Sequence, residues 1–271
     1  RLILGSYLSR LLPFFFALII YRFSGSKLYL ISSFLILICT DLLIYLSGER
    51  TSFFLLLLST ILIISLVKKY KIYRLLAFTV SLLIILIFTL KYDSVNDRMI
   101  KSTIIETKIL TENPVAFTEG HTAMFNTAFE IFKYNPIIGV GPKLYREACK
   151  NPLYNKNKDS INKAINTCNT HPHNTYFQLL SETGIIGILP LTFMLFLLIY
   201  LFFRQIVGGL ISKKINVLTD YQVCLLVTLF VTLWPLAPSM NFFGNWVSAI
   251  YFLPAGFILH SFNNKDEDVI R

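Results

Sequence analysis

Two histidines, His171 and His173, flank a proline in the stretch "THPHNTYF", just before a long apolar segment. Imidazole is the side chain best suited to move a proton near neutral pH, so either residue could be a general base. The alternative is a capping or loop hydrogen bond, and it competes more strongly for His171. Asn174 suits the N-cap of the helix that follows. A third histidine, His121 in "TEGHTAMF", is interpreted on its own as structural.

Two arginines lie where a membrane-bound anion could reach them. Arg50, in "SGERTSFF", falls at headgroup level, about one turn into a helix predicted to begin near Ser47. Its planar guanidinium could grip a lipid phosphate, although it could instead snorkel to the interface or pair with Glu49. Arg10 lies ~20 Å above the cytoplasmic end of its apolar run. A charge at that depth indicates function, unless upstream sequence changes the limits of the span and Arg10 only snorkels.

Two cysteines, Cys149 and Cys168, bracket a polar excursion rich in Lys and Asn. An oxidising compartment would permit a disulfide between them, holding the base of the histidine motif. The alternative is a zinc site shared with His171 and His173, although the spacing matches no standard zinc pattern.

The composition places these residues in a membrane protein. Of 271 residues, 55% are hydrophobic and 15% charged, and the mean hydropathy is +0.62. Apolar runs long enough to cross a bilayer recur along the chain, which predicts an all-α, polytopic integral membrane protein. The net charge of +10 is attributed to positively charged cytoplasmic loops rather than to nucleic-acid binding, because the charges are scattered. The chain begins at Arg1 inside an apolar run, so we expect a fragment that lacks its N-terminal part.

About seven transmembrane helices are expected, because seven apolar runs approach the ~20 residues that cross the bilayer core. The predicted spans are residues 2–23, 28–46, 47–67, 72–90, 184–203, 221–236 and 242–262. The predicted organisation is four spans in 1–90, an extracytoplasmic loop subdomain in 91–183, three spans in 184–262 and a cytoplasmic tail in 263–271.

The distribution of Lys and Arg in the short loops sets the predicted orientation. Basic loops at 22–27, 68–74 and 204–214 should face the cytoplasm, and residues 47–50, 91–183 and 235–245 should lie outside. Within the long outer loop, "TAMFNTAFEIFKY" has apolar residues at helical spacing, and "NPIIGVGP" is typical of a helix stop. The loop is therefore expected to be a mostly helical subdomain.

Taken together, these elements resemble the O-antigen ligase and polymerase family of bacterial envelope glycosyltransferases. Three stretches carry the resemblance in the family's order: "SGERTSFF", "AFEIFKYNPIIGVGPKLY" and "HPHNTYFQLLSETGIIG". It covers most of the chain from about Gly48 to Gly187, and one long outer loop before the last three spans agrees with it.

The resemblance implies a metal-independent transferase, without cofactor, on the outer face of the bacterial inner membrane. Its donor would be a glycan on a polyprenyl pyrophosphate, and its acceptor a hydroxyl of lipid A–core or of another glycan repeat, in contact with membrane lipids. The family's essential histidine corresponds to His173 and its membrane-surface arginine to Arg50. Many members have an arginine where this chain has His121, so Arg146 or Arg10 could supply the second pyrophosphate contact.

Two classes of protein compete with the transferase. A transporter or flippase of lipid-linked saccharides would have charged residues in several span centres and broken helices in paired positions, of which only Arg10 and Pro190 give a hint. A non-catalytic envelope scaffold would tolerate the loss of its histidines and arginines. Ligase and polymerase use the same residues, so the sequence leaves that choice open.

Overall fold

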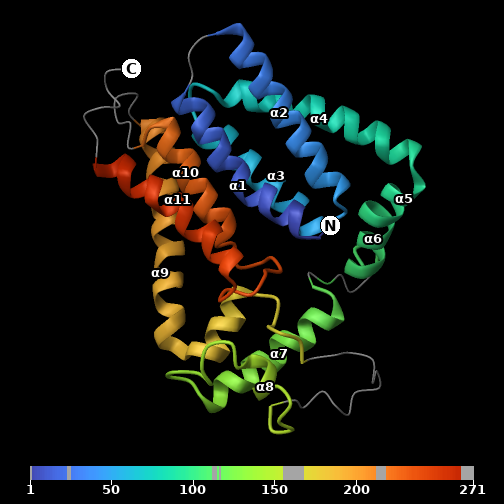
Figure 1. Ribbon diagram of the computed structural model, residues 1–271, viewed down its shortest axis with the longest axis vertical. Coiled ribbons are helices and arrows are strands. Elements are labelled where there is room, and N and C mark those ends of the chain that lie inside the picture. The colour runs from blue at the N-terminus through green and yellow to red at the C-terminus, as the bar shows by residue number, and fades with distance from the viewer. Residues whose placement is uncertain are drawn as a thin grey trace. The chain divides into compact units, whose positions relative to one another are not determined.

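The structure is a computed structural model that describes residues 2–22, 26–111, 115, 117–154, 168–211 and 218–263, the side chains of 2–3 and 209–211 excepted. Within these ranges the chain is helical and has no β-strand. It divides into two compact units (Figure 1). Unit 1 comprises Arg1–Thr103, Leu198–Thr232 and Ile250–Arg271, and unit 2 comprises Ile104–Leu197 and Leu233–Ala249.

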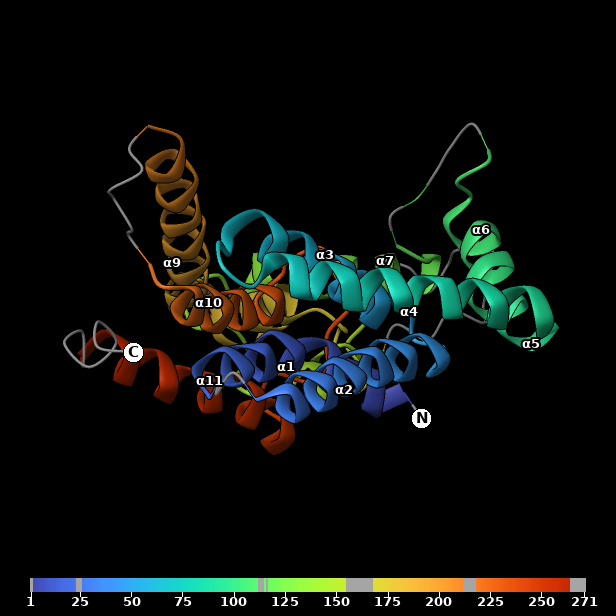
Figure 2. The ribbon, with the colours of Figure 1, turned by 90° about the horizontal axis from the view of Figure 1, so that it is seen from above.

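Unit 1 is a bundle of long apolar helices. Helices α1, α3 and α10 pack against one another, and α4 packs against both α2 and α3 (Figures 1 and 2). Their apolar residues recur without a dominant polar face, as expected of helices surrounded by protein on one side and lipid on the other. The helices are α1 (Leu2–Tyr21), α2 (Lys27–Leu46), α3 (Arg50–Leu66), α4 (Lys71–Lys91), α5 (Asp93–Asn96), the π-helix η1 (Asp97–Lys101), α10 (Asp220–Thr232) and most of α11 (Asn245–Asn263).

Unit 2 is built around one amphipathic helix and the start of a long one. Helix α7 (Glu119–Tyr134) is followed by the short α8 (Tyr145–Ala148) and by the first part of α9 (Thr175–Ile211), and α6 (Ser102–Thr107) leads into the unit. Buried Ala128, Ile131 and Tyr145 form its core. The helix predicted over residues 122–134 and its stop at "NPIIGVG" are both confirmed.

Four helices are long and apolar enough to cross a membrane, counted over the described ranges: Leu4–Tyr21, Lys27–Leu46, Lys71–Lys91 and Thr175–Gly208. Helices α3 and α10 are apolar but shorter. At 1.5 Å per residue, the 17 residues of α3 span ~26 Å, slightly less than the hydrocarbon core. The class of polytopic, all-helical membrane protein is therefore confirmed, and the count of seven spans stays a prediction. Residues 212–217 and 264–271 of the predicted inner loop and tail lie outside the described ranges.

One prediction about the cytoplasmic loops is wrong. Arg74, predicted to face the cytoplasm, is fully buried in the first turn of α4. Its guanidinium donates to both oxygens of Asp41 on α2, at 2.7 and 3.0 Å, and to Thr60 on α3 at 2.7 Å. Ser81 donates to the same Asp41 carboxylate. Loop counting missed the pair because Asp41 and Arg74 are 33 residues apart in sequence and only the packing of three helices brings them together.

Candidate active site

Helix α9 begins at the histidine motif, and Asn174 caps it as predicted. The Asn174 Oδ1 atom accepts the backbone N–H groups of Tyr176 and Phe177, at 2.9 and 3.2 Å. Its Nδ2 atom donates to the carbonyl oxygens of Pro235 and Ala237. This amide therefore caps the helix and also ties its start to the segment before α11.

His171 is held in a structural position on both sides of its ring. The side chain is buried, and Nε2 lies 3.2 Å from the Ser239 carbonyl oxygen, which can only accept, so Nε2 carries the proton. Nδ1 then accepts from the Thr170 hydroxyl at 3.0 Å. Burial first, and then His173, lower the pKa of His171 from 6.5 to about 4, although the Ser239 contact opposes the shift. A buried ring whose pKa is lowered this far serves poorly as a base, so the structural alternative fits His171.

His173 is half-buried and has a nitrogen that can accept a proton. The Asn169 Oδ1 atom accepts the Thr170 backbone N–H at 2.8 Å, which orients the amide so that Nδ2 donates to His173 Nε2 at 2.9 Å. Nε2 is therefore unprotonated in the neutral ring. Burial first, and then His121, lower the pKa of His173. The ring thus stays neutral, with its lone pair on Nε2, around pH 7.

The backbone of His173 is also unusual. Its φ of 55° lies in the left-handed region, which few non-glycine residues adopt. The Ser239 backbone N–H donates to the His173 carbonyl oxygen at 2.8 Å. The same segment thus holds the backbone of His173 and the ring of His171, and a constrained conformation of this kind is common at functional sites.

The fold brings His121 to the other two histidines. It lies in the first turn of α7, where Thr118 caps the helix and contacts His121 Nδ1 at 3.0 Å. The ring centroid of His121 is 5.8 Å from that of His173, and that of His171 is 4.3 Å from His173. The position of His121 at the N-terminus of a 16-residue helix favours binding of an anion nearby.

The glycine motif and the start of the α9 span form one interlocked structure. Helix α9 is broken at Gly184, where φ is 61° and ψ is −158°. The Ile185 and Ile186 N–H groups donate to the carbonyls of Pro136 and Ile137, while Val140 and Gly141 N–H groups donate to the carbonyls of Ser181 and Glu182. A Cβ atom at Gly139 would overlap the peptide after Glu182, and one at Gly184 would overlap Ile137. The two glycines are therefore required by the close approach of the two segments.

Buried polar side chains below the histidines hold the same segments together. Gln178 donates to Glu182 Oε2 at 3.0 Å and to Asn241 at 2.8 Å. Glu182 Oε1 accepts the backbone N–H of Tyr145 at 2.9 Å. The sequence analysis missed Gln178 and Asn241, and also Asn169 and Ser239. The i, i+4 spacing of Gln178 and Glu182 in the sequence was the one signal that could have indicated their hydrogen bond.

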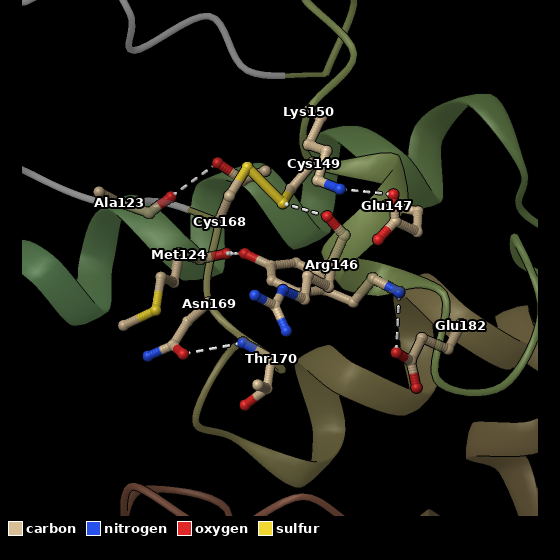
Figure 3. The surroundings of a disulfide bond; sticks show 12 residues. Ala123, Met124, Arg146, Glu147, Cys149, Lys150, Cys168, Asn169, Thr170 and Glu182 are labelled. Atoms are coloured by element: carbon tan, nitrogen blue, oxygen red, sulfur yellow. Dashed lines mark hydrogen bonds and ion pairs between the residues drawn. A yellow bond between two sulfur atoms is a disulfide. The ribbon is translucent and has the colours of Figure 1, made fainter.

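A disulfide joins Cys149, after α8, to Cys168, before the histidine motif, with the Cα atoms 5.4 Å apart (Figure 3). It links the two segments for which the sequence predicts a bridge. The polar excursion at 155–167 lies outside the described residues. Arg146 on α8 is exposed, and neighbouring Tyr145 is buried with its hydroxyl donating to the Met124 carbonyl. Burial raises the pKa of this tyrosine, so it stays protonated.

The other predicted cations, Arg50 and Arg10, belong to unit 1. Arg50 is half-buried and is the first residue of α3, not one turn in as predicted, because Gly48, with φ of 75°, ends the preceding turn. Arg98 of η1 donates from Nε to the Gly48 carbonyl at 3.1 Å, which adds a cation beside this turn that the sequence analysis missed. Arg10 is buried and donates to the Ser6 carbonyl and hydroxyl.

No group of three or more His, Cys, Asp or Glu side chains able to hold a metal ion occurs among the described residues. The two cysteines of the zinc alternative are joined to each other. The chemistry that the histidines can perform is proton transfer by imidazole, and Arg146 in the same unit is an exposed cation that can hold an anion.

The fold defines a polytopic, all-helical membrane protein in which His173 lies just before a candidate span. The family model described as O-antigen ligase matches residues 33–192, more than half of the chain. The chain belongs to this family of glycosyltransferase-like enzymes, which act on lipid-linked glycans in surface-polysaccharide synthesis. No curated protein and no solved structure matches the chain.

Proposed function

We propose that this protein transfers a glycan from a polyprenyl pyrophosphate to a sugar hydroxyl, with His173 as general base. The observation that carries the proposal is the unprotonated Nε2 of His173, held toward the Asn169 amide at 2.9 Å. In the free protein Asn169 occupies the direction from which an acceptor hydroxyl would donate. As the acceptor oxygen attacks, its proton passes to Nε2, the bond from the anomeric carbon to the pyrophosphate oxygen breaks, and polyprenyl pyrophosphate leaves.

The leaving pyrophosphate gains negative charge, and fixed cations lower the barrier by binding it. Arg50, with its planar fork, is the primary candidate, and Arg10 and Arg146 are further candidates. His171 and His121 complete the binding set, the first by holding the loop and the second at the N-terminus of α7. The proposed step uses no metal, so transfer should persist after treatment with a chelator.

The resemblance and the apolar helices support a location in the inner membrane, with the site on the periplasmic side. In this topology, residues 1–90 and 184–262 span the membrane, 91–183 form the periplasmic subdomain and 263–271 the cytoplasmic tail. Reporter fusions after residues 70, 150 and 263 would test it, because only the fusion at 150 should report an extracytoplasmic position.

The acceptor class separates two versions of the proposal. A ligase would use lipid A–core, and a polymerase would use another glycan repeat. A deletion strain distinguishes them by its surface glycan: loss of a ligase leaves lipid A–core bare, and loss of a polymerase leaves single repeats attached.

Transfer by purified protein from a lipid-linked donor, normalised to folded protein, tests the base. Loss of general-base catalysis costs roughly 10²–10⁴-fold in rate, and we expect that loss in His173→Ala. His173→Asn is the sharper variant, because Asn tolerates the left-handed backbone but cannot take the proton. His260→Ala, an exposed histidine on α11, is the matched control. Normal transfer by well-folded His173→Asn would remove the base from the mechanism.

One observation favours the transporter alternative, because the buried Asp41–Arg74 pair places two further charges among the long apolar helices. Each charge is neutralised by the other, however, which suits a structural role. A fluorescent lipid-linked saccharide that crosses the membrane of proteoliposomes containing His173→Asn would favour the transporter. Glycan transfer by the unchanged protein without such movement would exclude it.

A further inference from the structure

Four isoleucines form an exposed apolar edge on unit 2. Ile137 and Ile138 come from the glycine turn, and Ile185 and Ile186 from α9 just after its break. All four side chains are exposed, Ile138 to 71%. They adjoin because the Ile185 and Ile186 N–H groups donate to the carbonyls of Pro136 and Ile137, at 2.9 and 3.3 Å. We call these four side chains the isoleucine edge.

The isoleucine edge continues a long apolar face of α9. Leu189, Phe193 and Phe196 are exposed, Phe193 to 70%. At ~100° per residue, these three positions fall on the same side of the helix as Ile185 and Ile186. Because α9 is a candidate membrane span, we expect this face to meet lipid. The isoleucine edge extends the face onto a turn that comes from a distant part of the chain.

Backbone N–H groups of this turn have hydrogen-bond partners within the protein, as an apolar environment requires. The Gly139 N–H donates to the Asn135 carbonyl, and the Val140 and Gly141 N–H groups donate to carbonyls of α9. Backbone groups that enter lipid must be satisfied within the protein, and the break at Gly184 supplies these partners. The exposed Tyr134 just before the turn, next to Lys133, is typical of the boundary between lipid and water.

We propose that the isoleucine edge inserts into the bilayer at the Gly184 end of the α9 span, with lipid acyl chains as its occupant. The interlocked glycine turn then anchors unit 2 to the membrane plane. His173 precedes Gly184 by eleven residues, at most ~16 Å of helix. In the transferase of the proposed function, the insertion would hold the base within reach of a pyrophosphate at the lipid surface.

Site-directed spin labelling in lipid nanodiscs tests the insertion without any measurement of catalysis. Single labels are placed at Ile138→Cys and Ile137→Cys after Cys39 and Cys224 are replaced by alanine, with the disulfide retained. Phe193→Cys serves as the lipid-facing reference, and Asn126→Cys, an exposed polar position on α7, as the aqueous reference. Collisions of each label with oxygen, which concentrates in lipid, are compared with collisions with a water-soluble nickel complex.

The expected result is that the labels at 137 and 138 collide with oxygen as the label at 193 does, and seldom with nickel. Labels that behave like the one at 126 would overturn the proposal. Shielding from both reagents would overturn it as well, because it would indicate a protein partner or a second copy of the chain. Failure of the proposed function would leave the collision pattern unchanged, so the two proposals can fail separately.

Discussion

Two regions of this protein bury charged or titratable side chains, and these side chains have different kinds of hydrogen-bond partner in the two regions. In unit 1, Asp41 and Arg74 are fully buried and bound to each other through two short hydrogen bonds. In unit 2, His173 is half-buried, has a strained backbone and keeps a nitrogen that can accept a proton. The ion pair joins two buried groups, whereas the lone pair of His173 Nε2 accepts from the exposed Asn169 amide, which a substrate hydroxyl replaces in the proposed mechanism. The two regions therefore differ in the partner of the buried group, because Asp41 is fully buried and Asn169 is exposed.

The largest effect should be a loss of stability on breaking the Asp41–Arg74 ion pair. Asp41→Leu would leave the Arg74 guanidinium buried without its partner, which typically costs about 3–5 kcal/mol. The double variant Asp41→Leu/Arg74→Met, which leaves no buried charge, should recover most of that loss. Thermal unfolding in detergent, monitored by tryptophan fluorescence, measures both. Equal destabilisation by the single and double variants would contradict a role as a neutralised pair.

The next effect is a loss of glycan transfer on substitution of Arg50. This residue lies in unit 1 and is proposed to bind the donor pyrophosphate. Arg50→Lys keeps the charge and removes the bidentate fork, so transfer should fall roughly 10- to 100-fold at unchanged protein level. Arg204→Lys, an exposed arginine near the C-terminal end of α9, is the matched control. Near-normal transfer by both Arg50→Lys and Arg50→Ala would remove Arg50 from the donor site.

The third prediction sharpens the assignment of the His173 ring. A carboxylate in Asn169→Asp would accept from Nε2 and stabilise the protonated ring, which would raise the pKa of His173. Because the base must be neutral, the acidic limb of the rate profile should move to higher pH, and activity lost at pH 7 should return in more alkaline buffer.

Asn151→Asp is the matched control, because the Asn151 side chain also accepts a backbone N–H, that of Leu153, rather than donating to His173. Its pH profile should match that of the unchanged protein. A pH profile for Asn169→Asp that does not move would contradict the proposed action of Asn169 on the His173 ring.

The smallest effect on transfer should come from the disulfide, because its sulfurs hold a loop and bind no substrate in the proposed mechanism. Thiol labelling of denatured protein without reductant should modify Cys39 and Cys224 only. After reduction, all four cysteines should react. Free reaction of Cys149 and Cys168 before reduction would contradict the bridge.

Local patterns in the sequence carried much of the architecture. Apolar run lengths indicated a polytopic membrane protein, because crossing a bilayer requires a minimum length of uncharged helix. The spacing of apolar residues predicted α7, and Asn174 was recognised as an N-cap, because both depend on contacts within a few residues. The order of three short motifs was enough to indicate the family.

Only the tertiary structure decided which neighbours surround these residues and therefore which hydrogen bonds their side chains make. Ser239 lies 68 residues after His171 in sequence, yet it fixes the ring of His171 and the backbone of His173, which no local pattern could reveal. Packing also buried Arg74 against Asp41 and brought His121 to His173. Residue type and spacing identify the groups capable of chemistry. The hydrogen bonds that those groups make depend on neighbours supplied by distant segments.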